Sequence, residues 1–276
     1  MSAQAALVGP DCFDLSGLLW SISAAMNFDI SHLLDAWDYQ AGQIVVRKFK
    51  GKDGKEKIQL RVDLGILQMN LVGRPDGKQP CGHESLLEHF ESRLAKHRAV
   101  HDNDEGFKLT PEDCAKLQQE AIQYHHRYIC LFQLKEFDAV LRDTQRNIKV
   151  FDFVEKFAEH PELAWALQQL RPQLLMMQIR ALGSKKLEAE DFEGAIASVE
   201  EGLEEIRAFY REHGRSDLIE QSGEIHSLEG WIQELRTARP LSEKEKLEHA
   251  LQDAVRREDY EKAAAVRDAL RSLEKR

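Results

Sequence analysis

The sequence predicts a mainly α-helical protein of the α+β class: helical hairpins in series, a small antiparallel β-meander near the N-terminus, and a further hairpin at the C-terminus. Three observations support this. From residue 85 onward apolar residues recur every three or four positions, the period of an amphipathic helix. Between residues 43 and 72 they alternate instead, as in a strand. Residues 247–273 carry two apolar helical stripes separated by a very short corner.

Shifts in pattern divide the chain into four parts. The first is expected to be flexible or loosely docked, because Gly9 and Pro10 interrupt regular structure and a clean pattern begins only near Met26. The expected parts are the N-terminal segment 1–25, a small α+β domain at 26–100 with a three-stranded meander, a helical-hairpin domain at 108–238 and the terminal hairpin at 241–276.

The meander is expected from strands near 42–49, 55–64 and 66–72, with a turn at Gly51–Gly54 between the first two. A loop rich in glycine and proline follows at 73–83. One interpretation is a ligand or partner loop, with polar contacts from Arg74, Asp76 and His83. The alternative is a structural double turn that leads the chain into the helix beginning near Ser85.

Helix signals are clear in the second half of the chain. Thr110, Pro111 and the acidic residues after them predict a capped helix start. A long apolar pattern at 161–187 contains Pro172, which predicts a kink or a break there.

An internal repeat links three of the helical hairpins. Each copy has an acidic residue, an aromatic residue and a second acidic residue, followed by an amphipathic helix; the aromatic residues are Phe137, Phe192 and Tyr260. In the middle copy, Gly183 lies in the first helix and Gly202 is expected where two helices cross. This copy resembles a tetratricopeptide repeat. The aromatic residues are 55 and 68 residues apart, so a regular array is not expected.

The terminal hairpin carries the most specific motif. The residues that define this motif are Glu258-Asp259-Tyr260-Glu261, Lys262-Ala263-Ala264 and Val266-Arg267-Asp268. The run resembles the UVR motif of the excinuclease B and C subunits, which also occurs in bacterial protein-arginine-kinase activators and some Clp-type ATPases. The order of segments along the whole chain resembles bacterial proteins known by this motif alone.

The resemblance implies a hairpin that docks proteins and has no catalytic role. The residues expected to contact a partner are Leu251, Ala254, Tyr260, Ala263, Ala264, Arg267, Asp268 and Leu270. So short a hairpin buries too little surface to stand alone, so its stripe must be covered by this chain, by a second copy in a homodimer, or by another protein. These alternatives stay open at the level of the sequence.

Composition narrows the classes of function. The net charge is −10, yet residues 43–61 carry +5 and residues 241–276 are neutral, which leaves about −15 on the rest. An acidic body repels phosphate backbones, so nucleic acid is disfavoured as a partner. The four cysteines form no CxxC pair and no apolar run is long enough to span a membrane, which favours the cytoplasm. No catalytic motif, cofactor fingerprint or complete metal-ligand set is recognisable.

Three functions are weighed on this basis. The first is a non-enzymatic adaptor or regulator that docks a protein partner through the terminal hairpin and its helical surface. The second is an accessory factor for nucleic acid, with contacts from the basic strand residues Arg47, Lys48, Lys50 and Lys52. The third is a sensor of small molecules built on the loop 73–83, which a pocket beside Arg74 and Asp76 would favour.

Overall fold

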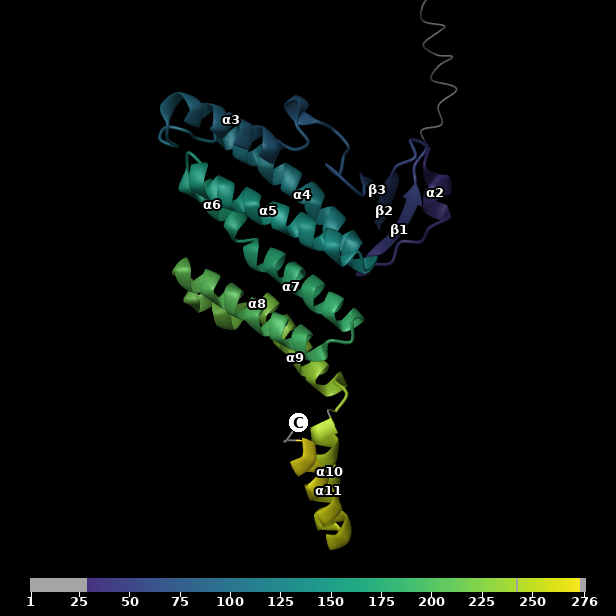
Figure 1. The fold of residues 1–276 in the computed structure, drawn as a ribbon. Helices are drawn as coiled ribbons and strands as arrows, with labels where there is room; N and C mark the ends of the chain where they lie inside the picture. The colour runs from purple at the N-terminus through teal and green to yellow at the C-terminus, as the bar shows by residue number, and fades with distance from the viewer. Residues whose placement is uncertain (1–28, 242, 274–276) are drawn as a thin grey trace, which may run out of the picture. The chain divides into compact units, whose positions relative to one another are not determined.

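The computed structural model describes residues 29–241 and 243–273 (Figure 1). They form two compact units, one ending at Leu71 and the other beginning at Val72. The expected architecture is confirmed: it is mainly helical, with a three-stranded antiparallel sheet near the N-terminus and a helical hairpin at the C-terminus. The predicted segment 1–25 lies outside the described residues.

The first unit holds a short helix and the sheet, whose strands lie in the order β1-β2-β3. Tight turns connect them, so Lys50 pairs with Glu56 and Val62 with Gly65. Ile58 and Met69 are direct cross-strand partners and both are buried, which identifies the buried face of the sheet. The elements are α2 (Ser31–Asp35), β1 (Val45–Lys50), β2 (Glu56–Val62) and β3 (Gly65–Asn70).

A buried arginine in β2 holds this unit together at one end. The Nε of Arg61 donates to the carbonyl of Trp37 at 2.8 Å. Its Nη1 donates to the carbonyls of Val62, of Asp63 at 3.1 Å and of Gly65 at 3.2 Å. One side chain therefore fixes both the segment after α2 and the turn between β2 and β3.

The second unit is a row of helices. Two short 3-10 turns, Pro80–Gly82 and Ser216–Gln221, lie among them. The helix α3 belongs to this unit, whereas the sequence grouped its residues with the sheet. The helices are α3 (Leu86–His101), α4 (Pro111–Gln133), α5 (Phe137–Phe157), α6 (Pro161–Gln168), α7 (Arg171–Glu188), α8 (Phe192–Glu212), α9 (Gly223–Ala238), α10 (Glu243–Arg256) and α11 (Tyr260–Leu273).

Local signals place two helix ends as expected. Thr110 and Asp113 form a reciprocal capping box at the start of α4, with Pro111 at the first helical position. The apolar pattern at 161–187 is divided between α6 and α7, and Pro172 lies in the first turn of α7. The predicted break at this proline is confirmed.

Packing follows the chain from α4 to α9. The helix α5 contacts α4 on one side and α7 on the other (Figure 1), and α8 packs against both α7 and α9, which also contact each other. One apolar core is shared by the last three of these helices and contains Leu175, Ile179, Val199, Leu203, Ile206, Leu228 and Ile232. Trp231 is partly buried and packs on this core.

The three related hairpins share one corner geometry. Lys135, Glu190 and Glu258 each adopt the left-handed conformation, with φ of 60°, 59° and 58°. The backbone N–H of the next residue donates to a carbonyl five positions earlier, at 2.9 Å in each corner. The donor–acceptor pairs are Glu136–Leu131, Asp191–Lys186 and Asp259–Ala254. The repeated aromatic residues begin α5, α8 and α11, immediately after these corners. The likeness to tetratricopeptide repeats remains a prediction.

The left-handed corner gives a first testable prediction. We expect Glu190→Gly to raise the free energy of unfolding by about 0.5–1 kcal/mol, because glycine adopts positive φ without steric strain. Glu201→Gly, at an exposed position inside α8, is the matched control and should lower it by about 1 kcal/mol. Urea unfolding measures both. Equal destabilisation by the two variants would contradict the strain assigned to the corner.

Helix crossing gives a second prediction. A Cβ added at Gly202 would collide with Cγ1 of Ile179, so the predicted crossing of two helices at this glycine is confirmed. We expect Gly202→Ala to lower the free energy of unfolding by about 1–3 kcal/mol through overpacking. Gly230 in α9 has no atom within 4 Å of such a Cβ, so Gly230→Ala should raise stability by about 0.5–1 kcal/mol. Thermal unfolding of the pair checks both signs.

Candidate functional site

The hairpin of α10 and α11 is the first candidate. Its two helices pack against each other across the corner at Glu258. Asp259 caps the second helix, because its Oδ1 accepts the backbone N–H of Lys262 at 3.1 Å. The corner therefore satisfies backbone groups of both helices with residues of the motif itself.

The facing stripe of this hairpin is only partly covered. Ala254 is 2% exposed and is the one buried residue among the described positions of the two helices. The other predicted contact residues of the stripe, Leu251, Ala263, Ala264 and Leu270, are half-buried. Near the corner, Val255 is 53% exposed and Tyr260 72% exposed. Apolar surface thus remains accessible on the hairpin.

Two charged residues of the motif face solvent. Arg267 and Asp268 are both exposed, and Nε of the arginine lies 3.7 Å from Oδ1 of the aspartate. An exposed pair at this distance adds little to stability. Both charged groups therefore remain accessible to a partner.

The basic strand residues do not form one patch. Arg47 and Lys48 are neighbours on β1, so their side chains leave opposite faces of the sheet. The guanidinium of Arg47 lies 4.2 Å from the ring centroid of Trp37, and its Nε donates to Gln59 at 2.7 Å. Lys48 lies 3.5 Å from Glu56. Lys50 is exposed on the face of Lys48, and Lys52 is exposed in the following turn.

The loop 73–83 is built from turns, and only part of it borders a cleft. The N–H of Gly77 donates to the carbonyl of Arg74 at 2.9 Å, and Asp76 accepts the N–H of Lys78 at 2.9 Å. Nε of Arg74 lies 3.4 Å from Oδ1 of Asp76. The ring centroid of His83 lies 5.4 Å from that of His89, and His83 is not part of the cleft lining.

A cleft of about 340 Å³ opens beside Arg74. Four arginines line it, from the loop, α4 and α5: Arg74, Arg127, Arg142 and Arg146. The remaining walls come from the residues after β3, the start of α3 and the facing sides of α4 and α5, namely Val72, Gly73, Glu84, Ser85, Glu88, Tyr124 and Asp143.

A buried ion pair forms the floor of this cleft. Arg127 and Asp143 are both 1% exposed, and two hydrogen bonds join them at 2.6 and 2.9 Å. Arg127 also donates to the carbonyl of Gly73 at 2.6 Å. Asp143 accepts a further hydrogen bond from Nε of Arg142 at 2.9 Å. The pair thus fastens the loop to α4 and α5.

Glu120 forms a second buried centre behind the cleft. Its side chain is fully buried, pairs with Arg146 and lies 3.1 Å from Nε of Arg74. It also accepts the backbone N–H of Leu86 at 2.8 Å, so the first turn of α3 is tied to α4. Burial and the positive charge of Arg74 lower the pKa of Arg146 to about 9. The ring of Tyr124 lies under Arg146, 4.2 Å from its guanidinium carbon.

Sequence reasoning singled out Arg74 but missed its partners. The local sequence pattern shows no functional motif at Glu120, Arg127, Asp143 or Arg146. A signal was present, because Glu120 and Arg127 are seven residues apart and fall on the buried face of α4. Charged residues on an apolar face must find partners, which marks them for closer inspection.

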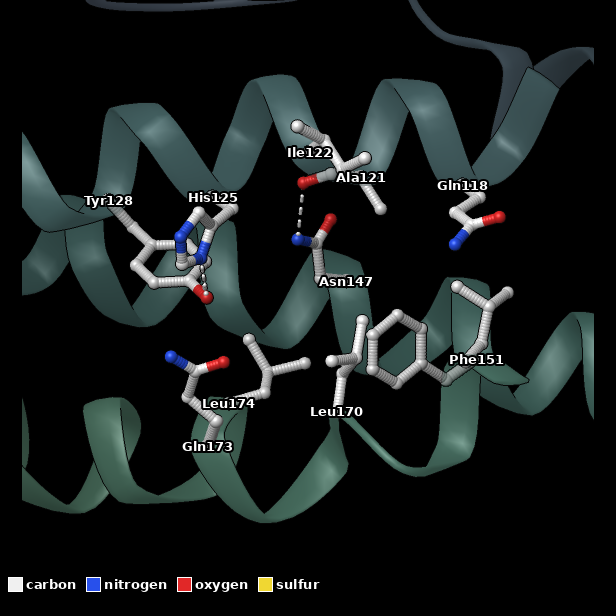
Figure 2. A pocket seen from close by; sticks show the side chains of 11 residues that line it. Gln118, Ala121, Ile122, His125, Tyr128, Asn147, Phe151, Leu170, Gln173 and Leu174 are labelled. Carbon is white, nitrogen blue, oxygen red and sulfur yellow. Dashed lines mark hydrogen bonds between the residues drawn. The ribbon is translucent and has the colours of Figure 1, made fainter. Parts of the chain in front are cut away.

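An apolar pocket of about 170 Å³ lies between α4, α5 and the start of α7 (Figure 2). Its polar groups bond to one another: His125 Nδ1 lies 2.7 Å from the hydroxyl of Tyr128, and Asn147 donates to the carbonyl of Ala121 at 2.9 Å. Burial lowers the pKa of His125. The pocket offers a small, mainly apolar wall.

Across residues 29–241 and 243–273, no three side chains of His, Cys, Asp or Glu converge as a metal site would require. Cys114 and Cys130 are buried, and burial raises the pKa of Cys130 to about 12, while Cys81 is exposed. None of the helices in these ranges has the length and apolar character needed to cross a membrane.

Comparison with known proteins supports the terminal motif. A family model described as the UvrB/uvrC motif matches residues 242–276. The resemblance drawn from the residues of the corner is thereby confirmed, over this part of the chain only. This motif occurs in proteins that interact with other proteins or with DNA repair factors. No curated protein and no solved structure matched the chain.

The buried pair gives a third prediction. We expect Asp143→Ala to lower the free energy of unfolding by about 3–5 kcal/mol, because it leaves Arg127 charged and buried without its carboxylate. Asp138 lies on the same helix as Asp143 and forms an exposed ion pair with Lys185 of α7. The control Asp138→Ala removes that pair and should change the free energy of unfolding by less than about 1 kcal/mol. Denaturant unfolding monitored by circular dichroism compares the variants. A loss below 1 kcal/mol in Asp143→Ala would contradict the structural importance of this pair.

Proposed function

We propose that this chain is a non-enzymatic adaptor or regulator that docks a protein partner through the α10–α11 hairpin. The observation that carries the proposal is the partly covered stripe on a hairpin matching a protein-interaction motif. Val255 and Tyr260 are exposed beside a seam in which Ala254 alone is buried among the described positions. A large aromatic side chain on the surface is the kind of residue that anchors protein interfaces.

The composition of the stripe supports a helical partner. Its alanines present little side-chain bulk, so a third helix can approach the backbone closely. Half-buried leucines flank them and would be covered by such a helix. The hairpin is formally neutral, which avoids repulsion from acidic and basic partners alike. We propose a protein of different sequence as the partner, and a homodimer through the same stripe is the alternative.

The nucleic-acid alternative has less support. Arg47 is engaged by Trp37 and Gln59, and Lys48 lies near Glu56. Cations with carboxylate or aromatic partners are less available to phosphates, and the strand divides them between two faces. Cytoplasmic placement remains part of the proposal and rests on the spacing of the cysteines.

The fourth prediction tests the docking surface. We expect Tyr260→Ala to lose at least about tenfold in affinity for the partner while keeping the fold, since the ring is largely exposed. Gln252→Ala, at an exposed position on α10, is the matched control and should bind like the parent chain. Partners are captured on the full chain and on a chain ending at residue 240, identified by mass spectrometry, then purified for titration.

Two outcomes would contradict the proposal. The captured proteins would be the same with and without the hairpin, or the purified partner would bind Tyr260→Ala and the parent chain equally. Titration with duplex and single-stranded DNA at low salt tests the alternative in parallel. Salt-dependent binding that survives removal of the hairpin would favour the basic strand instead.

A further inference from the structure

The arginine-lined cleft holds more positive charge at its floor than its buried carboxylates supply. Arg74, Arg127 and Arg146 are largely or fully buried, and Asp143 and Glu120 are the buried carboxylates that face them. Asp76 lies 3.4 Å from Arg74 but is partly exposed. The rim adds a fourth guanidinium, that of Arg142, whose side chain is 44% exposed.

Hydrogen bonding at the floor is also incomplete. The Nε atoms of Arg74 and Arg146 are buried and have no hydrogen-bond acceptor among the described residues. Arg74 Nε lies within ion-pair distance of Glu120, yet the N–H is not directed at that carboxylate as a hydrogen bond requires. Buried N–H groups of charged side chains are rarely left without an acceptor. An acceptor-rich group entering the cleft would satisfy them.

We propose that this cleft binds a small acidic ligand, with a carboxylate or phosphate group held by Arg74, Arg142 and Arg146. The planar guanidinium presents paired donors that match the oxygen atoms of both groups. A cleft of about 340 Å³ has the size of a small-molecule site. The site is distinct from the α10–α11 hairpin and does not depend on the docking role proposed for it.

The mouth of the cleft restricts the ligand further. Glu84 and Glu88 line it, and both are exposed. Their carboxylates repel additional negative charge on the part of the ligand that leaves the cleft. The site therefore fits one acidic group on a neutral or positively charged remainder better than a polyanion. Val72, which lines the cleft and is 71% exposed, offers an apolar surface for that remainder.

The fifth prediction is a binding experiment on the full chain. Inorganic phosphate, acetate and citrate are titrated calorimetrically at constant low ionic strength. We expect saturable binding of phosphate or acetate at one site, with citrate weaker than the better of the two. Phosphate binding alone identifies a phosphoryl ligand, and acetate binding alone identifies a carboxylate. The proposal is overturned if neither phosphate nor acetate binds. It is also overturned if citrate binds more tightly than both.

Matched variants locate the site. Arg142→Gln removes a rim cation and its bond to Asp143 but keeps both hydrogen bonds between Arg127 and Asp143, and it should weaken binding about tenfold. Arg146→Lys keeps a charge opposite Glu120 but loses the planar fork, and should weaken it comparably. Glu84→Gln should strengthen binding severalfold by removing repulsion at the mouth. The control Arg236→Gln, on the surface of α9 and paired with Glu200, should leave affinity unchanged.

Circular dichroism first verifies that each variant is folded. If Arg146→Lys does not fold, Arg142→Gln and Glu84→Gln still decide the matter, because both positions are exposed. Affinity that is unchanged in both of these variants, or reduced equally by Arg236→Gln, would place the anion elsewhere and overturn the proposal.

Discussion

The second unit depends most on the bidentate pair between Arg127 and Asp143. It joins α4 to α5, and the additional bond from Arg127 to Gly73 ties the chain leaving the sheet to both helices. Glu120 extends the cluster to the first turn of α3 through Leu86. Buried charges of this kind stabilise a structure only when all their partners are in place. The cluster therefore specifies one arrangement of loop and helices more than it adds to overall stability.

The terminal hairpin, in contrast, is held together by apolar contacts and not, among its described residues, by buried charges. Its seam is made of alanines and leucines, and full burial is reached only at Ala254 among the positions the structure describes. Small side chains allow close helix approach but remove little apolar area from water. Any partner that covers the seam adds its own binding free energy to the folded state of the hairpin. The chain thus combines a buried polar cluster with an apolar hairpin, α10–α11, whose stability increases when a partner binds.

Signals between near neighbours in sequence predicted most of the fold. Thr110 with Pro111, the break at Pro172 and the corners before the repeated aromatic residues all depend on residues within one helical turn. The cleft could not be predicted in this way. Arg74 stood out because glycine and proline surround it, whereas its partner Glu120 lies on a helix far along the chain. Pairings of this kind are decided by helix packing, which a local pattern does not encode.

The common corner geometry has a consequence for how such a chain can change. The three corners each have one residue in the left-handed conformation and the same backbone hydrogen bond. The helices between the corners differ in number and length. Because the hydrogen bonds of a corner are local, the corner sets no requirement on the length of the two helices that it connects. Helices of different length can therefore follow the same corner, and the repeated aromatic residues are accordingly 55 and 68 residues apart.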